Sequence, residues 1–283
     1  MALTINTNLG SLIVQKNLDS ATKSLNQAIE RMTTGYKINS ARDDAAGYAV
    51  ATKMETTLGS ISVAQDNAAI GSSMLSTLES NYDLLTTHYQ RIRDLTEEAA
   101  NGTYGSDSID AIKAEVTARM AEINRIAASA EFNGVKIMNG SKTGGVVLQI
   151  GVDSSDNSKL TLSADLFANA NSATLTEVAD ATLQGYYTAG GTNYGTALTA
   201  IDKALTKITT RQTNIGALQN RLDSASDALE VQYSNVTSSL STIKDADVAA
   251  ESSAYIKAQI LQQASASLLA TANQTPSIAL NLI

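Results

Sequence analysis

The clearest pattern in the sequence is a seven-residue repeat of apolar positions toward its C-terminal end. One row of the repeat comprises Ile201, Ile208, Ile215, Leu222, Leu229, Val236 and Ile243. A second row lies three residues ahead of the first, and the middle of that row is polar: Gln212, Gln219 and Ser226. Two such rows are typical of a coiled-coil seam, so residues 198–243 predict one helix about 68 Å long.

A second set of apolar residues, spaced by three and four, runs from Leu75 to Ile92. The turn-forming residues 101–105 follow, and a further apolar row then extends from Ile109 to Ala127. A long helix, a short glycine-containing turn and another long helix predict an antiparallel helical hairpin.

Both ends of the chain carry narrow apolar rows and few charges. The rows comprise Val14, Leu18, Ala21, Leu25, Ala28 and Met32 at one end, and Ala250, Ala254, Leu261, Ala264 and Leu268 at the other. A single pair of such helices buries too little apolar surface to offset the conformational entropy lost on ordering both ends. We therefore expect the ends to be disordered or frayed in the monomer and to become ordered when other copies cover them.

The stretch from Phe132 to Gly195 differs from the rest of the chain, because it holds nine of the 17 glycines. Residues 146–150 form a β-type run, and residues 160–162 predict a second strand. The rest of 160–195 shows no pattern that predicts its fold, and 174–195 is expected to be a short insertion rich in Gly and Thr. The expected fold is therefore mainly α, a long antiparallel helical bundle or coiled coil with a small β-hairpin region at its tip.

The composition argues against an enzyme. The chain has no Cys and a single His, His88, which excludes zinc–thiolate sites, cysteine nucleophiles and two-histidine metal sites. Asp43 and Asp44 are adjacent and project in different directions on a helix, which favours a helix start over acid–base chemistry. Residues 153–157 lack the Gly and the Glu of an EF-hand loop. We expect no catalytic residue, no cofactor and no metal.

Charge and hydropathy exclude two further classes of partner. The net charge is −8, from 20 basic and 28 acidic residues, which disfavours binding to nucleic acid. The apolar stretch 258–283 is interrupted by polar residues and a proline, so we expect no membrane insertion. The first basic residue, Lys16, stands after the apolar residues that it would precede in a signal peptide, so we expect export by another route.

Six motifs, in this order along the chain, resemble those of bacterial flagellins. They are GYKINSARDDAAG at 35–47, EFNGVK at 131–136, LQIG at 148–151, IKDAD at 243–247, QILQQA at 259–264 and LATANQ at 269–274. The resemblance covers residues 1–150 and 196–283. It identifies the chain as a member of the flagellin family, in a short form with little or no outer variable domain.

The resemblance implies a particular domain organisation. Residues 1–44 would form the N-terminal helix and spoke of the inner domain, called D0, and residues 241–283 would form its C-terminal helix. Residues 45–240 would form the helical domain D1, which includes the β-hairpin and variable insertion at about 132–195. Terminal helices paired in this way would polymerise into the flagellar filament that drives swimming motility.

The family also implies partners and a location. The principal partner is the chain itself, as a helical homopolymer. An export chaperone on the C-terminal segment and the hook-associated junction and cap proteins are further expected partners. Export through the flagellum's own type III channel would place the chain outside the cell, in the extracellular filament.

One segment resembles the family's subunit contact, which in some flagellins also binds the vertebrate toll-like receptor for flagellin. The matching residues are Gln90, Arg91, Leu95, Glu98 and, on the facing helix, Glu115. The sequence departs from the family at Glu97 and Glu98, where many members carry an apolar residue and Gln. The two added negative charges predict altered axial packing or weaker receptor binding. The expected assembly seam of the terminal helices comprises Val14, Leu18, Leu25, Met32, Leu261, Ala264 and Leu268.

Alternative functions stay open at this stage. A hook–filament junction protein shares the paired terminal helices, and a secreted helical effector or adhesin would act as a monomer. A protease carried on the filament would need a His-Glu-x-x-His motif, which a chain with one histidine lacks.

Overall fold

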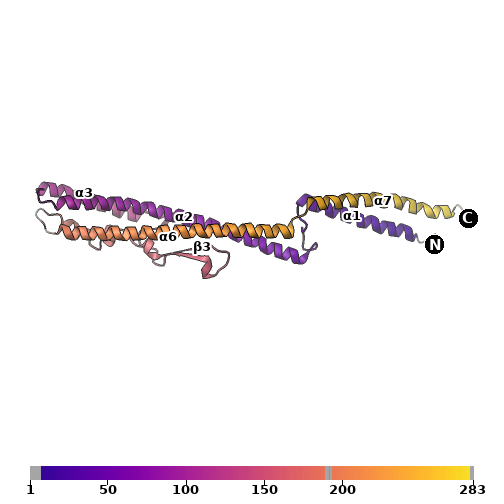
Figure 1. The fold of residues 1–283 in the computed structure, drawn as a ribbon, viewed down its shortest axis with the longest axis horizontal. Helices are drawn as coiled ribbons and strands as arrows, with labels where there is room; N and C mark the ends of the chain where they lie inside the picture. Colours follow the sequence, from indigo (N-terminus) through magenta and orange to yellow (C-terminus); the bar gives the residue numbers. More distant parts are fainter. Residues whose placement is uncertain (1–7, 189–190, 192, 281–283) are drawn as a thin grey trace. The chain divides into compact units, whose positions relative to one another are not determined.

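The computed structural model describes residues 8–188, 191 and 193–280, with the side chains of 275–280 left out. Its helices and strands are, in chain order, α1 (Leu9–Thr34), α2 (Ala45–Ala99), α3 (Ser106–Ser129), β1 (Glu131–Phe132), β2 (Val135–Lys136), β3 (Val146–Gln149), η1 (Asp156–Ser158), β4 (Lys159–Leu162), η2 (Ala164–Phe167), α4 (Ser172–Thr176), α5 (Asp180–Gly185), α6 (Tyr194–Lys244) and α7 (Val248–Leu280). The chain is mainly helical, as the sequence predicts (Figure 1).

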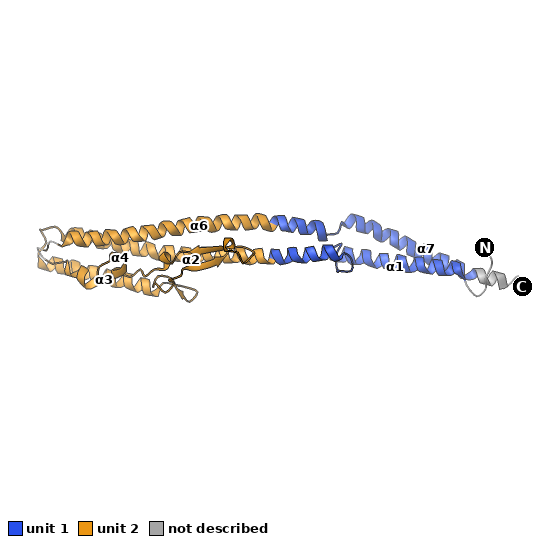
Figure 2. Cartoon of the chain, turned by 90° about the horizontal axis from the view of Figure 1, so that it is seen from below, with its two compact units in different colours: residues 1–58, 234–283 blue, residues 59–233 orange. Residues whose placement is uncertain are grey.

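The described chain divides into two compact units, shown in different colours in Figure 2. Unit 1 comprises residues 1–58 and 234–283, and unit 2 comprises residues 59–233. Helices α2 and α6 contribute residues to both units. The sequence-based boundaries of D0 and D1, at residues 44 and 241, stay a prediction.

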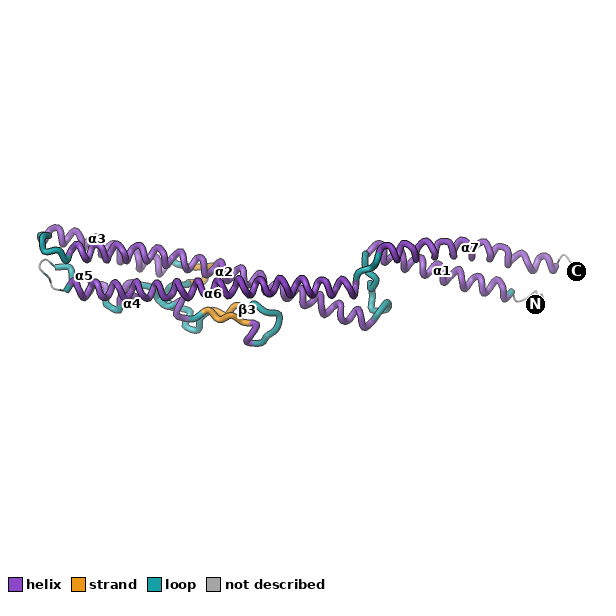
Figure 3. Tube along the Cα trace, in the orientation of Figure 1, coloured by secondary structure: helices purple, strands orange, loops and turns teal. Residues whose placement is uncertain are grey.

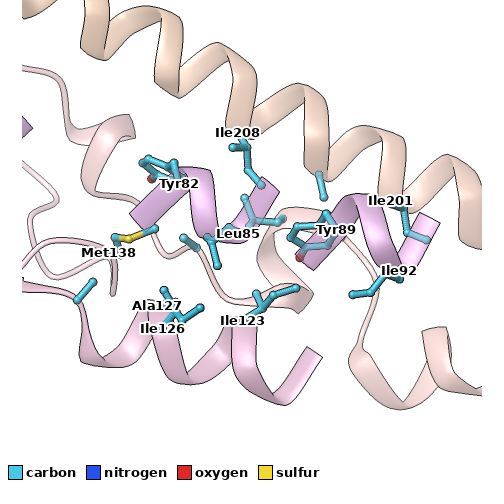
Figure 4. Close-up of a cluster of buried hydrophobic side chains, with 14 of the residues drawn as sticks. Tyr82, Leu85, Tyr89, Ile92, Ile123, Ile126, Ala127, Met138, Ile201 and Ile208 are labelled. Atoms are coloured by element: carbon cyan, nitrogen blue, oxygen red, sulfur yellow. The ribbon is translucent and has the colours of Figure 1, made fainter. Parts of the chain in front are cut away.

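The core of unit 2 forms where α2, α3 and α6 pack together. Apolar side chains from all three helices meet there, and their exposed fractions are close to zero (Figure 4). The buried members include Tyr82, Leu85, Tyr89 and Ile92 of α2, Ile123 and Ile126 of α3, and Ile201, Ile208 and Ile215 of α6. The predicted helical hairpin is thus confirmed as core-forming, and so is the first heptad row from Ile201 to Leu222.

The second heptad row lies at the margin of this core, which explains why its middle is polar. Half-buried Gln212 donates from Nε2 to Asp83 Oδ1 at 2.7 Å, and Gln219 donates to Glu79 Oε2 at 3.0 Å. The acceptors belong to α2, so two amide–carboxylate bonds link the antiparallel helices beside the apolar row. Polar pairs of this kind specify the register of a helix pair at some cost in stability.

The short strands form two separate antiparallel pairs, drawn in orange in Figure 3. In the larger pair, Val146 of β3 lies opposite Leu162 of β4, as the two predicted strands require. The expected place of the hairpin at the tip of the bundle is wrong. Asn67 Nδ2 of α2 donates to the Gln149 carbonyl at 3.0 Å, so the hairpin lies beside α2 far from the turn at 100–105. The reason is that α3 runs back along α2 before the chain enters the strands.

Strand β4 and residues 163–188, whose fold the sequence does not predict, complete the core of unit 2. Their apolar side chains are buried: Leu160, Leu162, Leu166, Phe167, Leu175, Leu183 and Tyr187. The Tyr82 hydroxyl donates to the Leu166 carbonyl at 2.9 Å. Residues 174–188 of the expected insertion therefore pack into the domain core and are not an outer addition.

Unit 1 is built around the antiparallel pair of α1 and α7. Asn8 caps α1, since its side chain accepts a hydrogen bond from the Ser11 N–H, and its Nδ2 donates to the Ala272 carbonyl at 2.7 Å. Gly35 ends α1 in the left-handed conformation (φ 75°), which glycine adopts without strain. Among their described side chains, α1 and α7 bury only small ones, those of Ala21, Ala28, Ala258 and Ser265.

The connections that leave α1 and α6 pair with each other in unit 1. Tyr36 and Asp245 form an isolated antiparallel bridge, and the Lys37 N–H donates to the Lys244 carbonyl at 2.7 Å. The Lys244 ammonium bonds to Glu55 and lies 4.5 Å from the centre of the Tyr36 ring. This hydrogen bond to Glu55 raises the pKa of Lys244. The segment 35–47, which resembles the flagellin signature, thus begins where the connection after α1 is hydrogen-bonded to the connection after α6.

Candidate functional site

The predicted contact residues on α2 and α3 form one ionic cluster. Arg91 Nε lies 3.2 Å from Glu115 Oε1, and Arg119 Nη2 lies 2.9 Å from the same oxygen. The hydrogen bond from Arg119, followed by that from Arg91, lowers the pKa of Glu115. The structure therefore brings Arg91 and Glu115 together from two helices, on a surface where both side chains are partly exposed.

Gln90 and Glu98 are also exposed on this part of α2, but Leu95 is not. Leu95 is 2% exposed and belongs to the core, so its predicted role as a surface contact is wrong. Its spacing explains the error, because Leu95 follows the core residue Ile92 by three positions and lies on the same side of the helix. The candidate surface is accordingly formed by Gln90, Arg91, Glu98 and Glu115.

The two glutamates that depart from the flagellin pattern have partners within the chain. Glu97 lies 2.7 Å from Arg93 Nη1, and Arg93 Nε also bonds to Asp202 Oδ1 of α6 at 3.0 Å. Glu98 accepts a hydrogen bond from the Tyr104 hydroxyl at 3.0 Å. Glu97 is thus paired with a cation, whereas Glu98 adds a negative charge to the candidate surface.

The predicted assembly seam of the terminal helices stays a prediction, and within the chain its residues lie differently on α1 and on α7. Val14, Leu18 and Leu25 are half-buried in unit 1, while Met32 is 38% exposed. On α7, Leu261, Ala264 and Leu268 are exposed; the face toward α1 instead presents Ala258 and Ser265. Small and polar residues form this contact, so a search for large apolar residues selects the neighbouring face.

A groove of about 620 Å³ lies between α1 and α7. Its floor is formed by the buried side chains of Ala21, Ala258 and Ser265, and Ser20 and Ser24 line it on the α1 side. The predicted seam residues of α7 line the other side: Leu261, Ala264 and Leu268. These three residues therefore line one surface of the groove, although their side chains are not buried against α1.

Asp43 and Asp44 organise the entry to α2, as the helix-start interpretation predicts. Asp43 accepts hydrogen bonds from the backbone N–H and the hydroxyl of Ser40 and from the Asn39 N–H, which lower its pKa. Asp44 accepts from the N–H groups of Ala46 and Gly47 at the first turn of α2. Both carboxylates serve local backbone groups.

Unit 2 contains a buried cation that the sequence pattern does not predict. Arg211 of α6 is 5% exposed, and its Nη1 lies 3.2 Å from the Tyr82 hydroxyl. Its guanidinium carbon lies 5.8 Å from the centre of the Tyr82 ring, and Asp165 lies 3.8 Å from Nη2. Burial raises the pKa of Tyr82. Arg211 lies on the side of the first heptad row opposite to the second row, in line with buried Ala204 and Leu218, so only the three-dimensional packing identifies it as buried.

Two kinds of site are not found in the part of the chain that the structure describes. No group of three or more metal-ligating side chains occurs among those residues. None of the helices described combines the length and apolarity needed to cross a bilayer.

Two family models match the chain. The bacterial flagellin N-terminal helical region matches residues 5–143, and the bacterial flagellin C-terminal helical region matches residues 198–283. The two matches leave out residues 1–4 and 144–197.

Curated relatives match over the whole length. A flagellin of Listeria monocytogenes is 32% identical over 284 residues and covers 99% of both chains. Flagellin B of Vibrio anguillarum is 32% identical over 378 residues and covers 100% of both. Since the second alignment is longer than this chain, the Vibrio protein contains residues that this chain lacks. Flagellin FlaB1 of Treponema pallidum is 30% identical, with 99% of both chains covered.

A solved structure agrees with the fold. A protein of Vibrio parahaemolyticus assigned as flagellar hook-associated matches with a TM-score of 0.60 at 17% identity, over 72% of this chain and 100% of the other. A Bacillus cereus flagellin matches with a TM-score of 0.47 at 25% identity, over 58% of this chain. From the two family models and the relatives of 30% identity or more along its full length, this chain belongs to the bacterial flagellin family.

Proposed function

We propose that this chain is a structural subunit of the bacterial flagellar filament and that it polymerises through α1 and α7. The observation that carries the proposal is the distribution of apolar side chains in unit 1. Among the described side chains of α1 and α7, the buried positions hold only Ala and Ser. Val14, Leu18 and Leu25 are half-buried, and many of the large aliphatic side chains of both helices are exposed. Burying each exposed aliphatic side chain would stabilise the protein by about 1.5–3 kcal/mol. Contacts with other copies would supply this burial.

The exposed aliphatic residues occur on both helices and on more than one face. On α1 they include Leu9, Leu12, Ile13 and Ile29, and on α7 they include Ile256, Ile260, Leu261 and Leu268. Soluble monomers rarely leave so much apolar surface uncovered along one helix pair. A helical assembly that surrounds each pair with its neighbours accounts for this composition.

The domain assignment of the family fits this proposal. Residues 1–44 and 241–283 would form the inner domain that holds the filament together, and residues 45–240 would form the outer domain. The chain acts by assembly and not by catalysis. A chaperone would bind the C-terminal segment, and the hook-associated junction and cap proteins would be further partners. Export through the type III channel would place the chain in the extracellular filament.

The surface of Gln90, Arg91, Glu98 and Glu115 is the proposed axial contact and the place where a vertebrate toll-like receptor for flagellin would bind. Its support is the ionic cluster that joins α2 to α3 and the sequence resemblance of this segment. Leu95 has no part in it, because its side chain lies in the core.

Salt-induced assembly of the purified chain, followed by electron microscopy, tests the proposal. We expect long filaments from this chain alone. A preparation that never polymerises by itself but joins a preformed hook would instead identify a hook–filament junction protein. An activity that the isolated monomer performs fully would favour the effector or adhesin.

A further inference from the structure

We infer that the groove between α1 and α7 receives the side chains of Ile256 and Ile260 from α7 of a second copy of this chain. The inference rests on the proposed function and specifies which faces of the terminal helices meet. Ile256 and Ile260 are named here the α7 ridge.

The groove has a shape that suits two branched side chains. Its floor is small and buried (Ala21, Ala258 and Ser265), so an incoming side chain can approach the helix backbones closely. Leu261 and Leu268 lie on its α7 side, 47% and 58% exposed. They are seven residues apart, about 10.5 Å along the helix, which leaves space between them over Ala264.

The α7 ridge has the complementary shape. Ile256 and Ile260 are 54% and 60% exposed and lie one helical turn apart, about 6 Å along the axis. Neither lines the groove of its own chain. The ridge is thus shorter than the groove, whose lining on α7 extends from Ala254 to Leu268, about 21 Å along the helix.

Charge selects this ridge over the outer face of α1. That face carries four exposed charged residues, Lys16, Asp19, Lys23 and Glu30. Residues 252–274 of α7 contain one, Lys257, which also lines the groove. Covering the α1 face would strip water from several ions, whereas covering the ridge and the groove involves only this one charged side chain.

The geometry also favours continued assembly over closed dimers. Ile260 and Leu261 are adjacent, so ridge and groove project about 100° apart around α7. A contact between two different surfaces leaves a free groove and a free ridge at the ends of each pair. Such heterologous contacts extend into rings or helical filaments.

Cysteine cross-linking in assembled filaments tests the pairing, and the chain has no natural cysteine to interfere. Ser20→Cys places a thiol in the groove and Ile260→Cys places one on the ridge. In filaments assembled from an equal mixture of the two full-length variants, mild oxidation should link residue 20 of one chain to residue 260 of another, identified by mass spectrometry of the cross-linked peptide. Lys23→Cys, on the charged face of α1, is the matched control and should not link to residue 260.

Leu12→Cys introduces a third thiol, which tests whether the exposed face of α1 from another chain occupies the groove instead. Filaments in which residue 20 links to residue 12 of another chain and not to residue 260 would overturn the inference while leaving the proposed function intact. If the parent chain forms no filaments under any condition, both the proposed function and the groove assignment are contradicted.

Filling the groove provides an independent test. Ala264 is exposed, so Ala264→Phe leaves the contact of α1 with α7 unaltered but occupies the space between the two leucines. We expect the critical concentration for polymerisation to rise about tenfold or more, and Ala264→Ser to leave it unchanged. Equal critical concentrations for Ala264→Phe and the parent chain would overturn the inference.

Discussion

Arg31 of α1 and Glu251 of α7 form the ion pair that joins the two terminal helices near the joint of the chain ends. Nη1 of Arg31 lies 3.0 Å from Oε1 of Glu251, and the side chains are only 28% and 15% exposed. The pair is therefore less screened by water than the surface pairs of unit 2, and it fixes the register in which α1 meets α7.

Charge reversal at this pair tests whether the pairing of α1 with α7 is required for assembly. Arg31→Glu places two carboxylates together, and we expect the critical concentration for polymerisation to rise about tenfold, which corresponds to about 1.4 kcal/mol. The exchange Arg31→Glu with Glu251→Arg should recover most of the loss. Sedimentation of assembled filaments measures both. A double variant as defective as the single one would contradict the role of the pair.

Substitutions of Leu95 and Gln90 should distinguish a core residue from a surface residue. Because Leu95 is buried among the core residues of unit 2, Leu95→Ala should lower the free energy of unfolding by about 2–5 kcal/mol. Gln90→Ala, at an exposed position of the same helix, should change it by less than about 0.5 kcal/mol. Urea denaturation followed by circular dichroism compares the two. Equal effects of the two substitutions would show that Leu95 is not a core residue.

The ionic cluster of Glu115 should respond to acid. Its pKa is lowered from 4.5 by Arg119 first and Arg91 second. A carboxylate with a lowered pKa contributes its stabilisation fully above its unfolded-state value, and the contribution disappears as the pH falls through the folded-state value. Replacing Arg119 with Ala should raise the pKa of Glu115 toward 4.5, and Arg91→Ala should raise it less. An NMR titration of the Glu115 side chain measures this, and an unchanged pKa in Arg119→Ala would contradict the assignment.

Removal of either chain end should separate assembly from folding. Deleting residues 1–34 or 250–283 should abolish filaments, because each deletion removes one partner of the α1–α7 pair. The helical circular dichroism of residues 45–240 should remain, since their core is formed by α2, α3, α6 and the segment 160–188. Normal filaments from either shortened chain would refute assembly through these helices.

The sequence predicts elements well where one apolar row faces one partner. The row from Ile201 to Leu229 and the α2–α3 hairpin are read correctly because large aliphatic residues at helical spacing occupy a continuous core. Residues 160–188 are different, since their buried side chains come from short segments with no repeating period. Their burial depends on contacts with α2 and α6 that are distant in the sequence.

The same limit of prediction from sequence applies to single residues of the candidate site. Arg91 and Glu115 are found by resemblance, and the structure brings them together in one ion pair. The prediction that Leu95 is a surface contact is wrong, because this apolar residue of the contact motif also lies at the spacing of the core residues. On α7 the contact with α1 is made by Ala258 and Ser265, which carry no hydrophobic signal strong enough to be distinguished from the neighbouring leucines.

Amide hydrogen exchange, measured on the dilute monomer and on assembled filaments, tests the central claim most directly. We expect residues 9–34 and 248–274 to exchange with little protection in the monomer and to become strongly protected in filaments, because so little is buried between α1 and α7 alone. The amides around Tyr82 and Ile92 should be protected in both states and serve as the internal reference. Monomers whose α1 and α7 amides are as well protected as that reference would contradict the claim that these helices depend on neighbouring copies.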